Sequence, residues 1–115
     1  MSKVTDALDA AGISYRVDGW APLKPPQDGA YAVVFEEIES FGDDRGKTLW
    51  FLHSPTVELY DDGFDAGRTV RDELCRQLSA LGVTFKRHEP TYISTEKVYM
   101  TVFDIEDYYE KESEL

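Results

Sequence analysis

The sequence predicts a single α+β domain, in which an antiparallel sheet carries two helices on one face, in the order α-β-β-β-α-β-β. Two segments have apolar residues at helical spacing, and the segments between them alternate apolar and polar residues with a period of two. The short polar stretches around residues 38–46 and 89–96 suit hairpins, which favours antiparallel pairing. The 115 residues are enough for one domain spanning residues 1–115.

The N-terminal part is predicted to hold a short helix, a brief strand and a long loop. Val4 and Leu8 lie on one face of a helix within residues 2–11. Residues 13–17 alternate as a short strand. Residues 18–30 contain three prolines and two glycines, which exclude regular structure and predict a loop.

The next two strands are predicted to form a hairpin. Residues 30–37 are strongly β-forming, and their core at residues 31–35 is apolar on both faces, which predicts a central strand. A polar loop over residues 38–46 leads into a second strand over residues 47–52. Ser54 and Pro55 then predict a bulge or a kink, because proline cannot donate to a ladder.

The rest of the fold is organised around a strand, a turn and a helix within residues 56–82. Residues 56–60 are rich in β-formers, and residues 61–63 (Asp-Asp-Gly) favour a turn. Asp65 is placed to cap the N-terminus of the helix with its carboxylate. The apolar stripe of the helix and the glycine that ends it are Val70, Leu74, Leu78, Leu81 and Gly82.

The C-terminal part is predicted to add further strands. Residues 83–87 form a short strand, and Tyr92 and Ile93 lead into another. Residues 97–105 predict a longer strand, with Val98, Met100 and Val102 on one face and Tyr99, Thr101 and Phe103 on the other. Residues 106–115 are acidic and are expected to be flexible.

The charge balance excludes several classes of function. The chain has 12 Lys and Arg against 23 Asp and Glu, a net charge of −11. Such a surface repels phosphates, which disfavours ordinary nucleic-acid binding but leaves open a protein that mimics DNA. Cys75 is the only cysteine, so no intramolecular disulfide can form. The sequence shows neither a membrane-spanning run nor a signal-peptide pattern, and we expect no membrane association and synthesis in the cytoplasm.

The sequence offers little chemistry for catalysis or for metal binding. His53 and His88 stand apart from each other, and Cys75 lies among the apolar residues of the predicted helix. The acidic residues of the 61–65 turn lack calcium-loop spacing, and turn and cap roles explain them. No phosphate loop or nucleophile motif is present. We therefore expect no enzyme activity, no metal and no cofactor.

Six aromatic residues fall in irregular or terminal places. They either cover the edges of the core or anchor an interface between subunits, where aromatic residues are enriched. These candidates are Trp20, Phe41, Phe64, Tyr92, Tyr108 and Tyr109.

The order of these pieces resembles the tail-terminator proteins of long-tailed bacteriophages and prophages, also called tail-completion, head–tail joining or minor capsid proteins. The resemblance covers residues 25–105. Its most distinctive elements are Glu-Leu-Tyr-Asp at residues 58–61 and Tyr-Ile-Ser-x-Glu-x-x-Tyr at residues 92–99. Pro25 and Pro26 before the apolar strand also belong to the pattern, whereas the acidic C-terminus departs from it.

The resemblance implies a structural virion protein at the head–tail junction, without an active site. Such proteins form a ring, commonly a hexamer, that halts growth of the tail tube and contacts the tail-tube protein and the head-completion or connector protein. An acidic bore would let DNA pass without binding it. The candidate lumen or axial loop consists of Glu39, Asp43 and Asp44.

The resemblance leaves the subunit join and one competing function open. If the strand at residue 56 or the final strand lies at a sheet edge, subunits are expected to pair through it. We also expect residues 18–30 and the acidic C-terminus to be mobile in the monomer. The alternative function is an acidic DNA mimic that inhibits a basic host protein.

Overall fold

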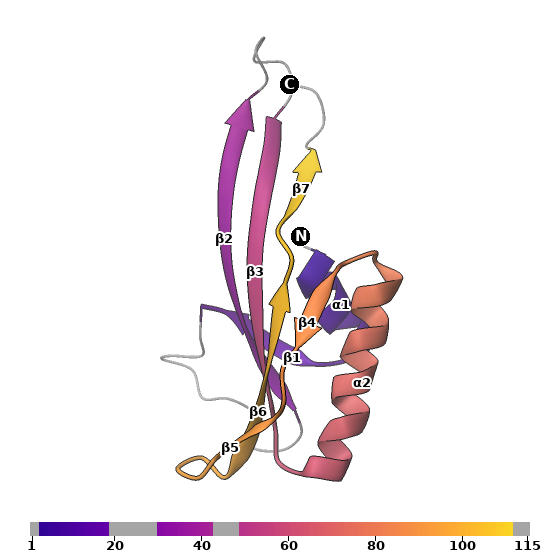
Figure 1. Cartoon of the computed structure of the whole chain (residues 1–115), viewed down its shortest axis with the longest axis vertical. Coiled ribbons are helices and arrows are strands. Elements are labelled where there is room, and N and C mark those ends of the chain that lie inside the picture. The colour runs from indigo at the N-terminus through magenta and orange to yellow at the C-terminus, as the bar shows by residue number, and fades with distance from the viewer. Residues whose placement is uncertain (1–2, 19–29, 43–48, 112–115) are drawn as a thin grey trace.

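The computed structural model describes residues 3–18, 30–42 and 49–111, and it shows one α+β domain with two helices and a seven-stranded sheet (Figure 1). The elements in chain order are α1 (Lys3–Ala11), β1 (Ser14–Val17), β2 (Tyr31–Gly42), β3 (Leu49–Asp61), α2 (Phe64–Ala80), β4 (Phe85–Arg87), β5 (Thr91–Ile93), β6 (Val98–Ile105) and β7 (Tyr108–Lys111). The sheet order is β1-β2-β3-β6-β4, with β5 paired to β6 and β7 paired to β3.

The predicted fold class is confirmed, with one parallel pair in a mostly antiparallel sheet. β1 runs parallel to β2, with Ser14 opposite Tyr31 and Val17 opposite Val34. A parallel pair needs a connection of about a dozen residues or more, and residues 18–30 supply that length. All other pairs are antiparallel.

The core lies between the two helices and one face of the sheet. Because side chains alternate across a strand, every second residue of β2, β3 and β6 points toward the helices. Leu8 on α1 and Leu74 on α2 meet that face and are fully buried. The remaining buried apolar residues of this cluster are Val4, Ala7, Ile13, Ala32, Val34, Val57, Leu59, Leu78, Val83, Phe103 and Ile105.

Helix α2 begins and ends close to the predicted positions, but its predicted cap is wrong. The N-cap is Gly63, which has no side chain with which to cap the helix. Since the helix already begins at Phe64, Asp65 lies inside its first turn and cannot serve as the N-cap. At the other end Gly82 has φ of 73°, as a glycine that ends a helix in the left-handed conformation does.

Strands β2 and β3 are longer than predicted and form an unbroken antiparallel pair. Their register runs from Tyr31 opposite Tyr60 to Gly42 opposite Leu49. The predicted bulge is wrong, because Pro55 keeps its place opposite Glu36. On its side away from β2, β3 has two different neighbours. Residues 50–53 pair with β7, and residues 56–61 pair with β6.

The acidic C-terminus is more ordered than expected. Tyr108–Lys111 form strand β7, which pairs with β3 from His53 to Trp50. Sequence reasoning did not predict this strand. It considered the acidic composition of this segment but not its two adjacent tyrosines, whose aromatic side chains favour a strand.

The molecule is elongated. Its principal extents are 53 × 31 × 20 Å, and its radius of gyration is 15.7 Å, against the roughly 13 Å of a compact domain of this length. The excess length follows from β2, β3 and β7, which project together beyond the helices in Figure 1.

Candidate assembly surface

The three projecting strands form an arm, which we define as residues 35–42, 49–55 and 108–111. β3 lies in the middle of the arm, between β2 and β7. Among the described residues, neither the 35–42 part of β2 nor β7 pairs with a further strand, so both outer edges are open. An open strand edge offers unpaired backbone groups to another chain.

One side of the arm carries a contiguous apolar patch, which we call the aromatic face. Phe41 lies directly opposite Trp50, and Leu52 lies directly opposite Tyr109. Cross-strand partners and residues two apart on a strand share a face, so all four point away from the helix-bearing side. The exposed fractions of Phe41, Trp50 and Tyr109 are 42%, 37% and 64%. Exposed aromatic residues gathered in this way are typical of a binding surface.

Carboxylates flank the aromatic face along the open edge of β2. Glu39 lies opposite Leu52, and Glu37 lies opposite Ser54, which places both on the same side as Phe41. Both glutamates are exposed. The surface that the arm presents is therefore aromatic at its centre and acidic at one edge.

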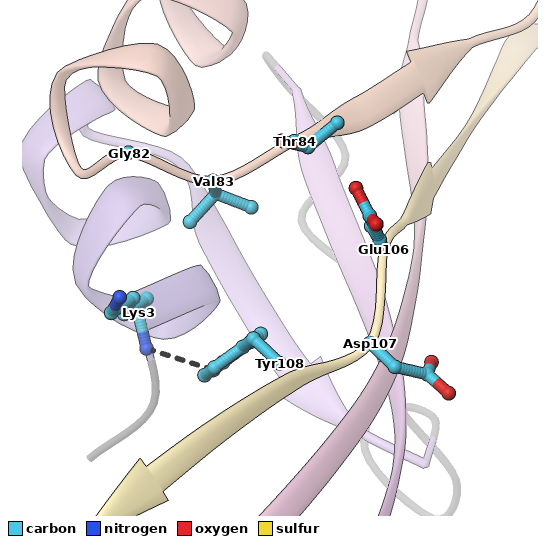
Figure 2. Close-up of a pocket in the computed structure, with 7 residues that line it drawn as sticks. All are labelled: Lys3, Gly82, Val83, Thr84, Glu106, Asp107 and Tyr108. Carbon is cyan, nitrogen blue, oxygen red and sulfur yellow. Dashed lines mark hydrogen bonds between the residues drawn. The ribbon is translucent and has the colours of Figure 1, made fainter.

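A buried histidine joins the three strands at the base of the arm. The Nδ1 atom of His53 lies 2.5 Å from a carboxylate oxygen of Glu36, and both side chains are less than one-tenth exposed. The Tyr108 ring stacks on the His53 ring, with centroids 4.7 Å apart and an interplanar angle of 6°. The backbone N–H of Lys3 donates to the Tyr108 hydroxyl at 3.3 Å, which ties β7 to α1 (Figure 2).

The pocket beside this contact is too small to be a ligand site. Its volume is about 90 Å³, below the ~300–1,000 Å³ of ordinary ligand pockets. Figure 2 shows its lining, in which Lys3, Glu106 and Asp107 carry the charges. The lining includes no histidine and no cysteine, so it lacks the usual pairing of a base with a nucleophile.

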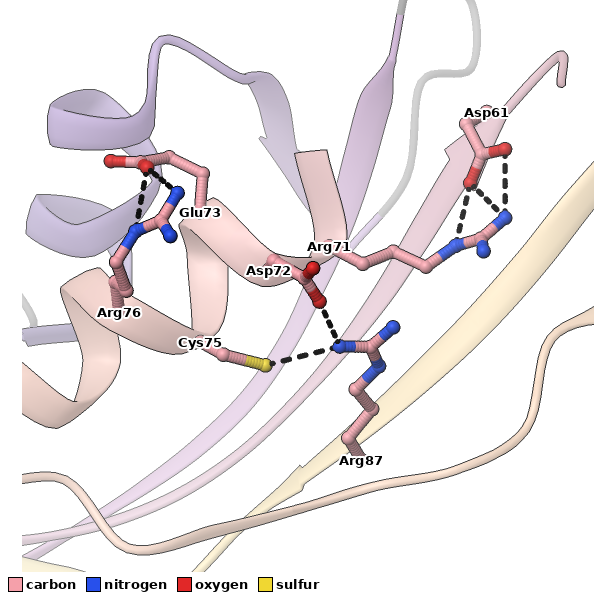
Figure 3. A network of polar contacts seen from close by, with 7 residues as sticks. All are labelled: Asp61, Arg71, Asp72, Glu73, Cys75, Arg76 and Arg87. Atoms are coloured by element: carbon pink, nitrogen blue, oxygen red, sulfur yellow. Dashed lines mark hydrogen bonds and ion pairs between the residues drawn. The ribbon is translucent and has the colours of Figure 1, made fainter. Parts of the chain in front are cut away.

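A buried ion pair joins the end of β3 to α2 (Figure 3). The guanidinium of Arg71 donates to both carboxylate oxygens of Asp61, at 2.9 Å and 3.1 Å, and the two side chains are 1% and 4% exposed. Burial raises the pKa of Asp61, and the hydrogen bonds from Arg71 act in the opposite direction. Gly67 lies against the same carboxylate, where a Cβ atom would collide with it.

A second hollow, of about 340 Å³, lies between α2 and the end of β4. We call it the basic groove, and its lining is Arg68, Arg71, Arg87, His88, Glu89 and Pro90. Arg87 donates to Asp72 at 2.8 Å, and this contact holds the pKa of the Asp72 carboxyl below its ordinary value. Arg68 is exposed and forms no ion pair with another described residue.

The structure distributes the six predicted aromatic anchors over different places. Phe41 and Tyr109 lie on the aromatic face, and Tyr92 is exposed on β5 beside Tyr99, with ring centroids 5.1 Å apart. Tyr108 is a packing residue, because its ring is stacked on His53. Trp20 and the side chain of Phe64 lie outside the described residues.

The predicted lumen loop is described only in part. Glu39 is exposed on the arm, as expected for a surface acid. Asp43 and Asp44 lie outside the described residues. The condition for a join through the strand at residue 56 is not met among the described residues, because residues 56–61 of β3 lie between β2 and β6. The final long strand, β6, is likewise paired on both sides, with β3 and with β4 and β5.

Sequence reasoning placed Trp50 in a strand and did not name it as a surface residue, although it is 37% exposed. A usable signal was present. Glu37 and Glu39 follow the apolar run of β2 and alternate with Phe41, and cross-strand partners such as Trp50 share their face. A hairpin whose one strand turns acidic therefore leaves the aromatic residues of the other strand exposed.

Comparison with models of known protein families finds no match, and comparison with curated proteins also finds none. Within the described part of the chain, no three His, Cys, Asp or Glu residues gather closely enough to hold a metal ion. No helix among the described residues is long and apolar enough to cross a membrane.

Proposed function

We propose that this chain is a ring-forming structural protein that ends the tail tube of a long-tailed phage and joins it to the head. The observation that carries the proposal is the projecting arm with its exposed aromatic face. The aromatic face buries little surface within its own chain, since Phe41, Trp50 and Tyr109 are 42%, 37% and 64% exposed, so it adds little to the stability of a monomer. A second subunit that covers the face explains why it exists.

The sequence resemblance supplies the particular assembly. Tail-terminator proteins act through their faces, as a ring of commonly six subunits, between the tail-tube protein and the head-completion or connector protein. In the proposed ring, the surface near the bore is acidic, in keeping with the net charge of −11 of each chain. Negative charge there repels the phosphates of DNA, so that the genome passes through without being held.

The competing hypothesis is an acidic DNA mimic that inhibits a basic host protein. A mimic needs rows of carboxylates that imitate phosphates, without large apolar gaps. On the arm, Glu37 and Glu39 lie between Phe35 and Phe41, which are 41% and 42% exposed. This alternation favours a partner that buries apolar surface over one that is held by charge alone.

Electron microscopy of purified tails tests the proposal. Tails that lack their terminator should acquire a capping ring at one end when the protein is added, and the capped tails should then join filled heads. Absence of the protein from tail ends at any concentration would reject the function. Salt-sensitive capture of a basic host protein, without tail binding, would favour the DNA mimic.

A further inference from the structure

The acidic arm and the basic groove lie on different parts of the molecule. We infer that the arm of one copy seats its aromatic face in the basic groove of the next copy, in a head-to-tail contact. The inference rests on the proposed function and deepens it, because it names the two surfaces through which ring subunits meet.

The groove has the chemistry to receive an aromatic and acidic surface. Arg71 is held by Asp61 and Arg87 by Asp72, so these arginines have fixed positions. The side chain of Arg87 is 30% exposed, which leaves room for an aromatic ring to stack against it. Arg68 supplies a cation that has no ion-pair partner among the described residues.

The groove also lies beside an open strand. β4 is the last strand in the sheet order and pairs only with β6 among the described strands. Of the acids at the groove, Asp104 lies 2.5 Å from His88, whereas Glu89 is an exposed member of the groove lining. Because Glu89 repels another carboxylate, an incoming glutamate is expected to meet Arg68, on the α2 side.

The arm of one copy could contact either the groove or the arm of a second copy, and the charges favour the groove. If two arms paired with each other, Glu37 and Glu39 of one copy would face the same residues of the other, and like charges across strands repel. Arm against groove instead places Glu39 near Arg68 and an aromatic ring near Arg87. Two different patches that meet in this way generate a ring or a filament, whereas a self-complementary patch stops at a dimer.

A mixing experiment with two defective variants tests the contact. The arm variant carries Phe41→Ser and Tyr109→Ser and keeps an intact groove. The groove variant carries Arg68→Glu and keeps an intact arm. Each variant alone is expected to lose self-association by about tenfold or more in dissociation constant, measured by sedimentation velocity. Mixed together, they should form a 1:1 dimer that does not grow, since each pair retains one good arm and one good groove.

Two controls separate the contact from misfolding and from general charge effects. Arg76→Glu removes an exposed arginine of the same helix outside the groove lining, and it should leave self-association unchanged. Glu39→Arg combined with Arg68→Glu in one chain should restore part of the lost association. Circular dichroism of each variant establishes that it is folded.

Different failures overturn different statements. If the wild-type protein forms rings but the mixed variants give no 1:1 dimer, the arm-to-groove contact is overturned. The same holds if both variants still form rings by themselves. In either case the proposed function stands. Loss of tail binding with unchanged self-association would make the tail-tube protein the occupant of the arm. A wild-type protein that neither self-associates nor binds tails would overturn both.

Discussion

The carboxylate of Asp61, at the end of β3, accepts hydrogen bonds from the guanidinium of Arg71, which lies two turns into α2. This pair fixes the helix to the strand that precedes it, across the turn at residues 62–63. Breaking a buried pair is costly because it leaves one charge without compensation. We expect Arg71→Met to lower the free energy of unfolding by about 3–5 kcal/mol, measured by urea denaturation.

Arg76 provides the matched control for this prediction. It lies on the same helix, and its pair with Glu73 is exposed. Exposed pairs contribute little, so Arg76→Met should barely change the unfolding midpoint. The double variant Asp61→Leu with Arg71→Met should recover much of the lost stability, since both charges are then gone. An equal loss for Arg71→Met and Arg76→Met would contradict the role of the buried pair.

For Gly67→Ala we predict a change in stability opposite in sign to the change that helix propensity alone predicts. In an exposed helix interior, Gly→Ala stabilises by about 1 kcal/mol. At Gly67 the new Cβ would collide with the Asp61 carboxylate, so Gly67→Ala should destabilise the protein instead. Thermal denaturation should show a lower midpoint. In a chain that also carries Asp61→Ala and Arg71→Met, the same Gly67→Ala change should be neutral or stabilising, and persistent destabilisation there would rule out this collision as the cause.

Tyr60 predicts a loss of stability in alkali. Its ring stacks on Tyr31 at 5.0 Å, and burial together with Glu58 raises its pKa well above the ordinary 10.0. Above pH 10 the unfolded chain therefore loses this proton while the folded chain keeps it, so stability is full below pH 10 and falls as pH rises. We expect a decline of at most about 1 kcal/mol per pH unit from this group, because the ring is partly solvated.

Tyr60→Phe is the control for the alkaline effect. Phenylalanine keeps the stack but cannot ionise, so the stability of this variant should fall less steeply between pH 10 and pH 11 in urea denaturation. The variant also loses the 2.9 Å hydrogen bond to Glu58, so its free energy of unfolding should already be lower than that of the unmodified protein at neutral pH. Identical pH slopes for the two proteins would show that Tyr60 does not cause the decline.

The arm and the core should respond differently to truncation. Phe41 is on the aromatic face, whereas Leu59 in β3 is fully buried in the core. Leu59→Ala should cost about 2–5 kcal/mol of unfolding free energy, and Phe41→Ser less than about 1 kcal/mol. Phe41→Ser should instead weaken self-association in sedimentation. A Phe41→Ser monomer that is as unstable as the Leu59→Ala variant would mean that Phe41 serves the core of its own chain.

Several elements could be predicted because their signals are local. The stripe through Leu74 and Leu78 and the glycine at residue 82 define α2 within a few neighbouring residues. The alternation of β6 likewise depends only on adjacent positions. The N-cap was missed by a shift of two residues, since Gly63 and Asp65 both suit the start of a helix.

The arm could not be predicted because it depends on long-range pairing. β7 forms only when Tyr108 reaches His53, 55 residues earlier, and the local acidic composition indicates the opposite. The exposure of Trp50 depends on its partner Phe41 and on the absence of a helix above that face among the described residues. Neither fact is visible in the residues adjacent to Trp50.

Local signals are enough to predict the α+β class, the two helices, the acidic charge balance and the main strands, because hydrophobic period and turn chemistry act between near neighbours. Three features emerge only in the folded chain: the strands that lie at the sheet edges, the contact of Tyr108 at the base of the arm, and the groove lined by Arg68, Arg71 and Arg87. These outcomes depend on which distant segments pair, and a strand carries the same alternating pattern whether its neighbour covers it or leaves it open.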